Sequence, residues 1–233
     1  DGSIDEKRKT LRVHLQSGDS EIVYLFKDSI SPDARTFAVA PHIVTGRNGM
    51  KINAHASFGV DITSSKLCNA LVDLGIGYNK SIAELKIPSI PEDLVKHFIR
   101  GYFDGDGCIT GWLATEKDKA DRIRYKFDIC SKTITMLSDI QKVLSKNDIN
   151  VNINYLKRDD MYRISTSSKS EVSKLYHYLY NDANFYLSRK FNKFSYYVNT
   201  EVSQLIADHR NAQEVNVNES NNPPTSAEHS IKE

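Results

Sequence analysis

Residues 99–107 read Ile-Arg-Gly-Tyr-Phe-Asp-Gly-Asp-Gly, and they close a helix that the sequence predicts from about Pro91. Proline suits the first position of a helix, and Glu92 and Asp93 suit its positive end. The segment up to Asp106 corresponds to about 24 Å of helix. It carries two apolar stripes, and a helix of this kind is expected to be buried between two partners. The stripes are Leu94, Phe98, Gly101 and Gly105, and beside them Val95, Ile99, Tyr102 and Phe103.

Asp106 stands at the C-terminal end of this predicted helix, where its carboxylate meets the negative end of the helix dipole. Gly107 follows as a natural residue for ending a helix. A negative side chain at a negative helix end repels unless a cation is supplied, so the placement is typical of a ligand for a hard metal ion. A lone Asp-Gly pair would instead be a solvated turn, but the whole nine-residue pattern favours the metal ligand.

This nine-residue pattern resembles the LAGLIDADG motif of homing endonucleases, position by position from Ile99 to Gly107. In that family two such helices pack side by side at the centre of the molecule, and the last acidic residue of each motif binds the catalytic magnesium. The resemblance therefore implies that Asp106 binds Mg²⁺ or Mn²⁺, with the carbonyl of Gly105 nearby. It covers roughly residues 1–200.

Asp1-Gly2-Ser3-Ile4 has the same form as Asp106-Gly107-Cys108-Ile109. We interpret Asp1-Gly2 as the end of a first motif whose helix lies upstream of Asp1, which makes Asp1 the second acidic ligand and catalytic residue. Without that helix the glycine stripe has no partner. We therefore expect a monomer when the protein is intact, and an unstable fragment or a dimer through that stripe when the helix is lacking.

Hydrophobic alternation and capping signals predict the same order of elements in both halves of the chain. The predicted strands cover residues 10–15, 36–39, 51–62, 108–113, 122–129, 150–156 and 161–165. The predicted helices cover residues 21–30, 65–74, 133–144 and 170–180, with a last helix that ends near 209.

The resemblance implies an α+β fold, a duplicated αββαββα unit with two curved antiparallel sheets and the first motif helix missing. The expected domains are an N-terminal repeat (1–88), a C-terminal repeat (89–210) and a polar disordered tail (211–233).

Two lysines occupy corresponding places in the two predicted repeats. Lys80 follows Asp1 by 79 residues, and Lys190 follows Asp106 by 84 residues. The family places a basic residue beside the attacking water at this point, so the resemblance implies a catalytic role for both lysines. Arg189, next to Lys190, is a candidate phosphate contact.

Long polar side chains alternate with apolar ones along the predicted strands. A two-stranded ribbon fits the major groove of DNA, so two similar polar faces favour double-stranded DNA as the partner. The candidate DNA-binding residues are Arg12, His14, Gln16, Arg47, Lys51, Asn53, Arg122, Arg124, Lys126, Asn152, Asn154, Lys157, Arg163 and Arg189.

The amino-acid composition says less about function than these motifs do. The chain of 233 residues has 31 Lys and Arg against 30 Asp and Glu, so its net charge of +1 does not by itself indicate nucleic acid. Cys68, Cys108 and Cys130 lack metal-ligand spacing and indicate reduced thiols in an intracellular, unsecreted protein. No membrane-spanning run and no signal peptide are visible.

The sequence therefore predicts a site-specific DNA endonuclease that makes a metal-dependent, staggered double-strand cut in a long recognition site. Two alternatives stay open at this point. One is a DNA-binding regulator that keeps the fold without cleavage, and the other is an intron maturase that binds structured RNA. An intein origin is disfavoured because the chain lacks a terminal His-Asn splicing end.

Overall fold

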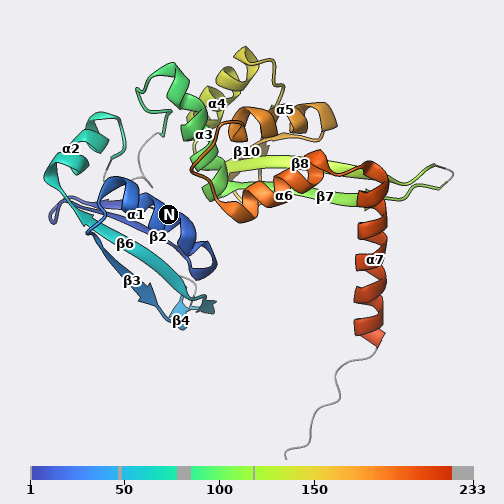
Figure 1. Cartoon of the computed structure of the whole chain (residues 1–233), viewed down its shortest axis with the longest axis horizontal. Coiled ribbons are helices and arrows are strands. Elements are labelled where there is room, and N and C mark those ends of the chain that lie inside the picture. The colour runs from blue at the N-terminus through green and yellow to red at the C-terminus, as the bar shows by residue number, and fades with distance from the viewer. Residues whose placement is uncertain (1, 47–48, 78–84, 118, 222–233) are drawn as a thin grey trace, which may run out of the picture.

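The computed structural model describes residues 2–46, 49–77, 85–117 and 119–221. The predicted site residues Asp1, Arg47 and Lys80 lie outside these ranges. Within the described ranges, the chain forms two four-stranded antiparallel sheets and a separate two-stranded hairpin. The first sheet lies to the left of Figure 1 and the second to the right. None of the described helices is both long enough and apolar enough to span a membrane.

The first repeat builds a sheet in which each strand pairs antiparallel with its neighbours. In spatial order the strands are β1 (Gly2–Asp5), β2 (Thr10–Gln16), β6 (Ser57–Thr63) and β3 (Arg35–Val39). A short 3-10 turn, η1 (Ser17–Asp19), leads from β2 into helix α1 (Ser20–Ile30), and α2 (Ser65–Asp73) follows β6. Ser64 caps α2 by accepting the N–H of Leu67 at 3.2 Å, as Ser commonly does at a helix start.

The second repeat follows the same plan. Its strands, in spatial order, are β7 (Gly107–Ala114), β8 (Arg122–Ser131), β10 (Met161–Thr166) and β9 (Asn152–Leu156). Helix α4 (Ile134–Lys146) follows β8 and α5 (Lys169–Tyr180) follows β10, as α1 follows β2 and α2 follows β6. The orders β1-β2-β6-β3 and β7-β8-β10-β9 therefore correspond strand by strand, and the predicted duplicated α+β fold with two antiparallel sheets is confirmed.

Helix α3 (Glu92–Asp106) is the predicted motif helix, and Pro91 is its N-cap. It packs against α5, β7 and β8. Its buried positions are Ile99, Arg100, Phe103 and Asp104. Among the described residues the glycine stripe faces outward, which is the result expected for a chain in which the first motif helix does not pack against it. Leu94 is 45% exposed, and a Cβ built on Gly101 or Gly105 would meet no described atom within 4 Å.

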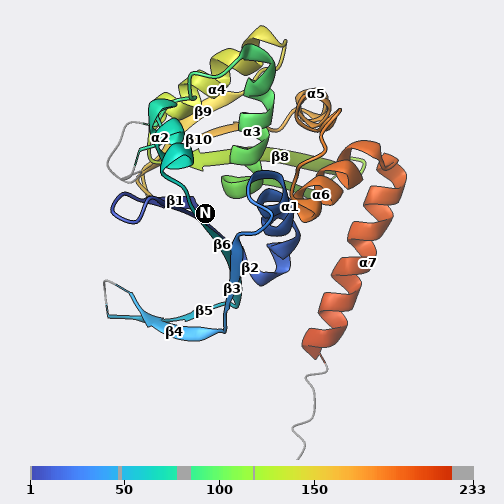
Figure 2. The same ribbon diagram turned by 60° about the vertical axis from the view of Figure 1, so that its left-hand side comes forward.

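Three other predicted elements differ from the structure. The predicted strand 51–62 is two strands, because β5 (Lys51–Ala54) pairs only with β4 (His42–Thr45) in a hairpin that projects from the first sheet (Figure 2). The predicted last helix is two helices, α6 (Ser188–Asn199) and α7 (Val202–Asn221). Helix α7 projects away from the body (Figure 1) and continues through residues 211–221, which the sequence predicts as disordered.

The two repeats have unequal cores. In the part of the chain that the structure describes, the cluster of the second repeat contains 22 buried apolar side chains. That of the first repeat contains three, namely Val23, Val60 and Ile62. The larger core includes the parallel-stacked rings of Phe103 and Phe127, whose centroids lie 4.8 Å apart. Helix α3 is thus anchored in the second repeat, which fixes the position of its acidic C-terminal end.

Candidate active site and nucleic-acid interface

Asp106 is the last residue of α3, and β7 begins at the next residue. The turn between them requires Gly107, because a Cβ there would overlap the Phe103 ring and lie 2.6 Å from the Phe103 carbonyl oxygen. The side chain of Asp106 is exposed. The last carbonyl groups of a helix have no partner within the helix and carry its negative end. The local fold therefore presents the Asp106 carboxylate together with the carbonyl groups of the last helical turn at an exposed point.

The donors at this helix end fit a hard divalent cation. The Asp106 carboxylate and the neighbouring Gly105 carbonyl are oxygen ligands, the type that Mg²⁺ and Mn²⁺ prefer. The described residues contain no group of three or more His, Cys, Asp or Glu side chains that could hold a metal alone. Water and phosphate oxygens would have to complete the coordination, as is usual for Mg²⁺ at phosphate sites. The predicted second carboxylate, Asp1, lies outside the described residues.

Lys190 comes from α6 and reaches the same helix end. Its Nζ donates a hydrogen bond to the carbonyl oxygen of Gly107, and it lies 5.3 Å from the centroid of the Phe103 ring. Burial lowers the pKa of the Lys190 amine, and the positive charge of Arg189 lowers it further. The structure thus brings a half-buried lysine, with an increased neutral fraction, to the residue that follows Asp106.

The sequence assigns no role to Asp104, but in the structure its side chain connects α3 to α5 and to the start of α6. The carboxylate is buried; its Oδ1 accepts the hydroxyl of Tyr180 at 2.6 Å, and its Oδ2 accepts the N–H of Leu187 at 2.9 Å. Burial raises the pKa of Asp104, although both hydrogen bonds oppose that change. Leu187 is the N-cap residue of α6, and its carbonyl oxygen accepts the N–H of Lys190. Asp104 therefore fixes the start of the helix that carries Lys190.

Arg100 also connects α3 to α5 and to the segment between α5 and α6, through two backbone carbonyl groups. Its Nε donates to the carbonyl oxygen of Phe185 at 2.9 Å, and its Nη1 donates to that of Leu179 at 3.1 Å. Nη1 also lies 2.7 Å from Nδ1 of His97. Burial lowers the pKa of Arg100 and also that of His97, whose protonation the nearby guanidinium further disfavours. A sequence signal existed, because two charged residues inside an apolar helix motif need buried partners.

Arg189 lies at the junction of the two repeats, not on a sheet face. Its Nε and Nη2 donate to Oδ1 and Oδ2 of Asp19 at 2.7 and 2.9 Å. This two-point pair raises the pKa of Arg189. In this structure the Arg189 guanidinium pairs with the first repeat, and its contact with phosphate stays a prediction. No local sequence pattern indicates this pair, because Asp19 and Arg189 are far apart along the chain.

The polar face of the second sheet follows the predicted alternation. In β8 the side chains of Arg122, Arg124 and Lys126 share one face, and the residues between them are buried. The register places Arg163 of β10 beside Asn154 of β9 on the same face. Asn152 of β9 lies on this face as well, and Lys157 is exposed in the turn after β9.

Acidic side chains pair with several of these cations. Glu116 accepts hydrogen bonds from Arg122 and from Arg124, the latter at 2.7 Å, and from Lys119. These contacts lower the pKa of Glu116 to about 2. Asp128 lies 3.2 Å from Nζ of Lys126. The polar face is consequently less positive than its arginines and lysines alone would make it.

The first sheet has a similar but smaller polar face. Arg12 donates two hydrogen bonds to Asp61, at 2.7 and 2.6 Å, and the contact lowers the pKa of Asp61. Nε2 of His14 lies 2.7 Å from the Ser57 hydroxyl. The register also places Arg35 of β3 directly across from Asp61, so this row contains a further basic residue that is not among the candidates predicted from the sequence.

The remaining candidates of the first repeat lie at its edge. Gln16 is exposed at the end of β2. Lys51 and Asn53 are exposed on β5 and so belong to the projecting hairpin, not to the four-stranded sheet (Figure 2). Their positions could not be predicted, because the sequence does not show that β5 and β6 are separate strands.

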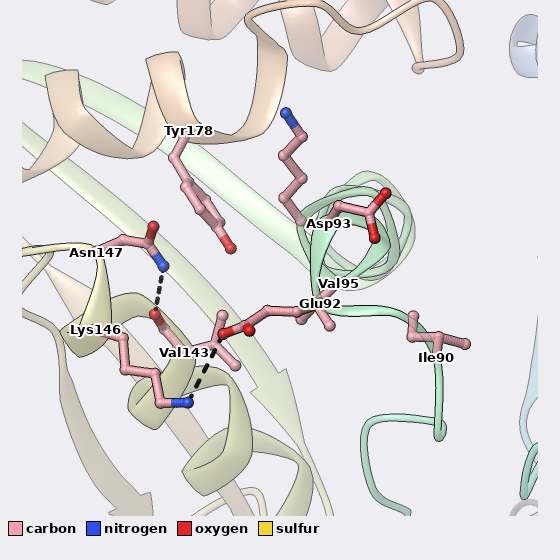
Figure 3. Close-up of a pocket in the computed structure, with 9 residues that line it drawn as sticks. Ile90, Glu92, Asp93, Val95, Val143, Lys146, Asn147 and Tyr178 are labelled. Atoms are coloured by element: carbon pink, nitrogen blue, oxygen red, sulfur yellow. Dashed lines mark hydrogen bonds and ion pairs between the residues drawn. The ribbon is translucent and has the colours of Figure 1, made fainter.

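A pocket of about 600 Å³ lies at the opposite end of α3, between α3, α4 and α5 (Figure 3). Glu92 and Lys146 approach to 3.9 Å there, and both side chains are exposed. At 1.5 Å per residue, Glu92 is about 21 Å along the helix from Asp106. The pocket is therefore separate from the acidic helix end and from Lys190.

Comparisons with known proteins agree with this fold. The family model described as LAGLIDADG endonuclease matches residues 99–202. A point mutant of I-SmaMI superposes with a TM-score of 0.57 at 11% identity, covering 96% of this chain and 94% of that one. The I-SmaMI LAGLIDADG homing endonuclease bound to cleaved DNA gives 0.52 at 12% identity, covering 95% and 88%.

The archaeal intron-encoded homing endonuclease I-Vdi141I, complexed with DNA, gives a TM-score of 0.39 at 18% identity, covering 55% of this chain and 76% of that one. No curated protein sequence matches the chain. The matched segment begins at Ile99, the first residue of the nine-residue motif, and ends at Val202, after α6. It therefore contains Asp106, Lys190 and the whole second sheet. Residues 99–202 are therefore similar to the LAGLIDADG endonuclease family, and the chain as a whole shares the fold of the I-SmaMI LAGLIDADG homing endonuclease.

Proposed function

We propose that this protein is a site-specific DNA endonuclease that cuts both strands of a long duplex site in a divalent-metal-dependent reaction. One observation carries the proposal. The exposed carboxylate of Asp106 stands at the negative end of α3, and the half-buried amine of Lys190 reaches the adjoining residue, Gly107. A metal ligand and a group able to exchange protons thus adjoin at one exposed point.

The two sheets supply the surface for the duplex. The second sheet presents arginine, lysine and asparagine side chains, the first presents arginine, histidine and glutamine, and two-stranded β ribbons fit the major groove. Phosphate contacts from such residues orient a protein on DNA, whereas contacts to base edges provide specificity. Because the two faces repeat with unlike residues, such as Arg12 in one and Lys126 in the other, the target is expected to consist of two different half-sites.

Hydrolysis adds water across a P–O bond of the backbone, and the two groups serve different parts of this reaction. A hard cation held by Asp106 and the Gly105 carbonyl would neutralise charge on the phosphate and lower the pKa of bound water. Lys190, whose pKa is lowered by burial, can accept a proton from water or hold a water molecule in line by hydrogen bonding. Asp104 and Arg100 keep the helix that carries Lys190 in place.

The duplication suggests one cut per repeat. If the first repeat places Asp1 and Lys80 as the second places Asp106 and Lys190, each repeat attacks one strand, and the two cuts are staggered. In one similar structure, I-SmaMI is bound to an uncleaved DNA target in the presence of calcium ions. For this protein we expect Mg²⁺ or Mn²⁺ to support cutting.

The test is the change Asp106→Asn, which preserves size but removes the charge. Incubation of the parent with a randomised duplex library and Mg²⁺, followed by sequencing of the cut ends, first defines a site. On that site we expect Asp106→Asn to abolish double-strand cleavage and to retain binding in a gel-shift assay. Binding is retained because one negative charge near the phosphates is lost.

Asp93→Asn is the matched control, since Asp93 is an exposed carboxylate at the other end of the same helix. It should cut at the parental rate. Undiminished cutting by Asp106→Asn would contradict the assignment of the site. Specific binding without any cut ends from the parent would instead indicate a DNA-binding regulator, and selective retention of structured RNA would indicate a maturase.

A further inference from the structure

The start of α6 is held by the first repeat as well as by α3. Arg189 makes its two hydrogen bonds to Asp19 of η1, and the backbone N–H of Ser188 donates to Oε1 of Glu21 in α1 at 3.1 Å. Asp19 and Glu21 come from the segment that directly follows β2. Two carboxylates of one repeat therefore meet the positive N-terminal end of a helix of the other, where negative charge is stabilised.

Asp19 is the best-buried carboxylate in this junction, with 6% of its surface exposed. A buried carboxylate is costly unless it is paired and hydrogen-bonded. Arg189 supplies both, in the planar two-point arrangement that suits guanidinium and carboxylate. Moving Arg189 onto DNA would leave the charge of Asp19 buried and without this partner, so the ion pair is expected to persist in a DNA complex.

This contact connects a candidate DNA-reading strand with the candidate catalytic lysine. On one side, Asp19 is three residues past Gln16, the end of β2, and the N–H of Ser17 donates to the carbonyl oxygen of Ala56, beside β6. On the other side, Arg189 directly precedes Lys190 in the first turn of α6. A shift of Asp19 relative to α6 would therefore move Lys190 relative to Gly107.

We propose that Asp19 is a positioning residue for Lys190, so that docking of the first repeat on DNA sets the geometry of the reacting lysine in the second repeat. The proposal rests on the nuclease function proposed above. In this arrangement Arg189 does not touch phosphate and Asp19 does not touch the reacting atoms. Their role is to keep the Lys190 amine in place while the two repeats close on the duplex.

The kinetic test compares Asp19→Ala, Asp19→Asn, Arg189→Ala and the double alanine variant. We expect each to lower the single-turnover cleavage rate, by up to about 100-fold, because small misplacements of catalytic groups have effects of that size. DNA affinity should remain close to the parental value. The double variant should be no slower than Asp19→Ala, since the pair is already broken.

Two results would overturn the proposal. The first is a parental cleavage rate for both Asp19 variants. The second is a loss of affinity in Arg189→Ala with a salt dependence reduced by about one unit of slope, which is what the loss of a phosphate contact produces. Arg189→Lys retains the charge but not the planar fork, so a rate closer to the parent in this variant would support a charge-pairing role.

A second readout needs no cleavage. Amide hydrogen exchange in the first turn of α6, measured without metal or DNA, should increase in Asp19→Asn, because Arg189 in that turn loses its charged partner in the first repeat. The matched control is Asp121→Ala, which breaks an Arg–Asp pair with Arg210 inside the second repeat. Unchanged exchange in Asp19→Asn would refute the contact. If exchange increases as expected but the parent protein never cuts DNA, the nuclease function is refuted, while the contact between Asp19 and the start of α6 is supported.

Discussion

The two repeats share a strand order but differ in what holds them together. The second repeat buries a continuous cluster that includes the rings of Phe103, Phe127 and Phe194, whereas the connected buried cluster of the first repeat, among the described residues, contains only Val23, Val60 and Ile62. Buried apolar area is the main source of folding free energy, so the second repeat is the more stable half. Duplicated topology therefore does not imply duplicated stability, and the first repeat depends on contacts such as Asp19–Arg189 for its placement.

The largest expected effect tests this difference directly. Phe127→Ala removes a fully buried ring from the second repeat and should lower the free energy of unfolding by about 3–5 kcal/mol. Val60→Ala removes two methyl groups from the first repeat and should cost about 2 kcal/mol. Amide hydrogen exchange then distinguishes the two repeats. In Val60→Ala the amides of β2 and β6 should exchange faster, while those of β8 should remain protected. Equal loss of protection in β8 would mean that the repeats unfold as one unit.

A second comparison concerns the two lysines. Lys190→Met should lower the single-turnover cutting rate by about 100- to 10,000-fold, the usual contribution of a proton-transfer group, with little change in DNA affinity. If each repeat cuts one strand, the variant should accumulate duplex nicked in a single strand, and Lys80→Met should give the nick in the other. Strand-specific end labels distinguish the two products. Equal losses of affinity and rate would make Lys190 a phosphate contact.

The sequence predicted the periodic parts of the fold well. The helix up to Asp106 and most strands were predictable because a 3.6-residue or a two-residue hydrophobic period reports directly on burial. The break between β5 and β6 was not, since Ile52 continues the alternation yet is exposed in the hairpin. Ile52 is exposed because the β4–β5 hairpin projects from the first sheet, and the local alternation of residues does not indicate where a hairpin leaves a sheet.

Part of the candidate site could be proposed from the sequence. Asp106 and Lys190 came from a motif and from spacing, and the structure places Lys190 beside Gly107. Asp104, Asp19 and the Arg189 pairing escaped prediction, because each depends on the contact of segments distant in sequence. A partly buried ion pair between the repeats produces no hydrophobic periodicity in either segment.

The smallest expected effect concerns the acidic residues on the two polar faces. Glu116 engages Arg122 and Arg124 in the second repeat, and Asp61 engages Arg12 in the first. Each carboxylate competes with DNA phosphate for its arginines and also repels phosphate. Glu116→Gln and Asp61→Asn should therefore each raise DNA affinity modestly, and Glu116→Gln more, because Glu116 occupies two arginines.

The pH dependence sharpens this last prediction. The basic partners of Glu116 hold its pKa at about 2, so the carboxylate is ionised throughout the range in which DNA binding is measured. The gain from Glu116→Gln should then be the same at pH 6 and pH 8, and it should shrink as salt screens the charges. Asp139→Asn is the control, since Asp139 pairs with Lys142 on α4 and not on a polar sheet face. A gain that appears only at one pH, or equally in the control, would show that Glu116 does not compete with DNA for its arginines.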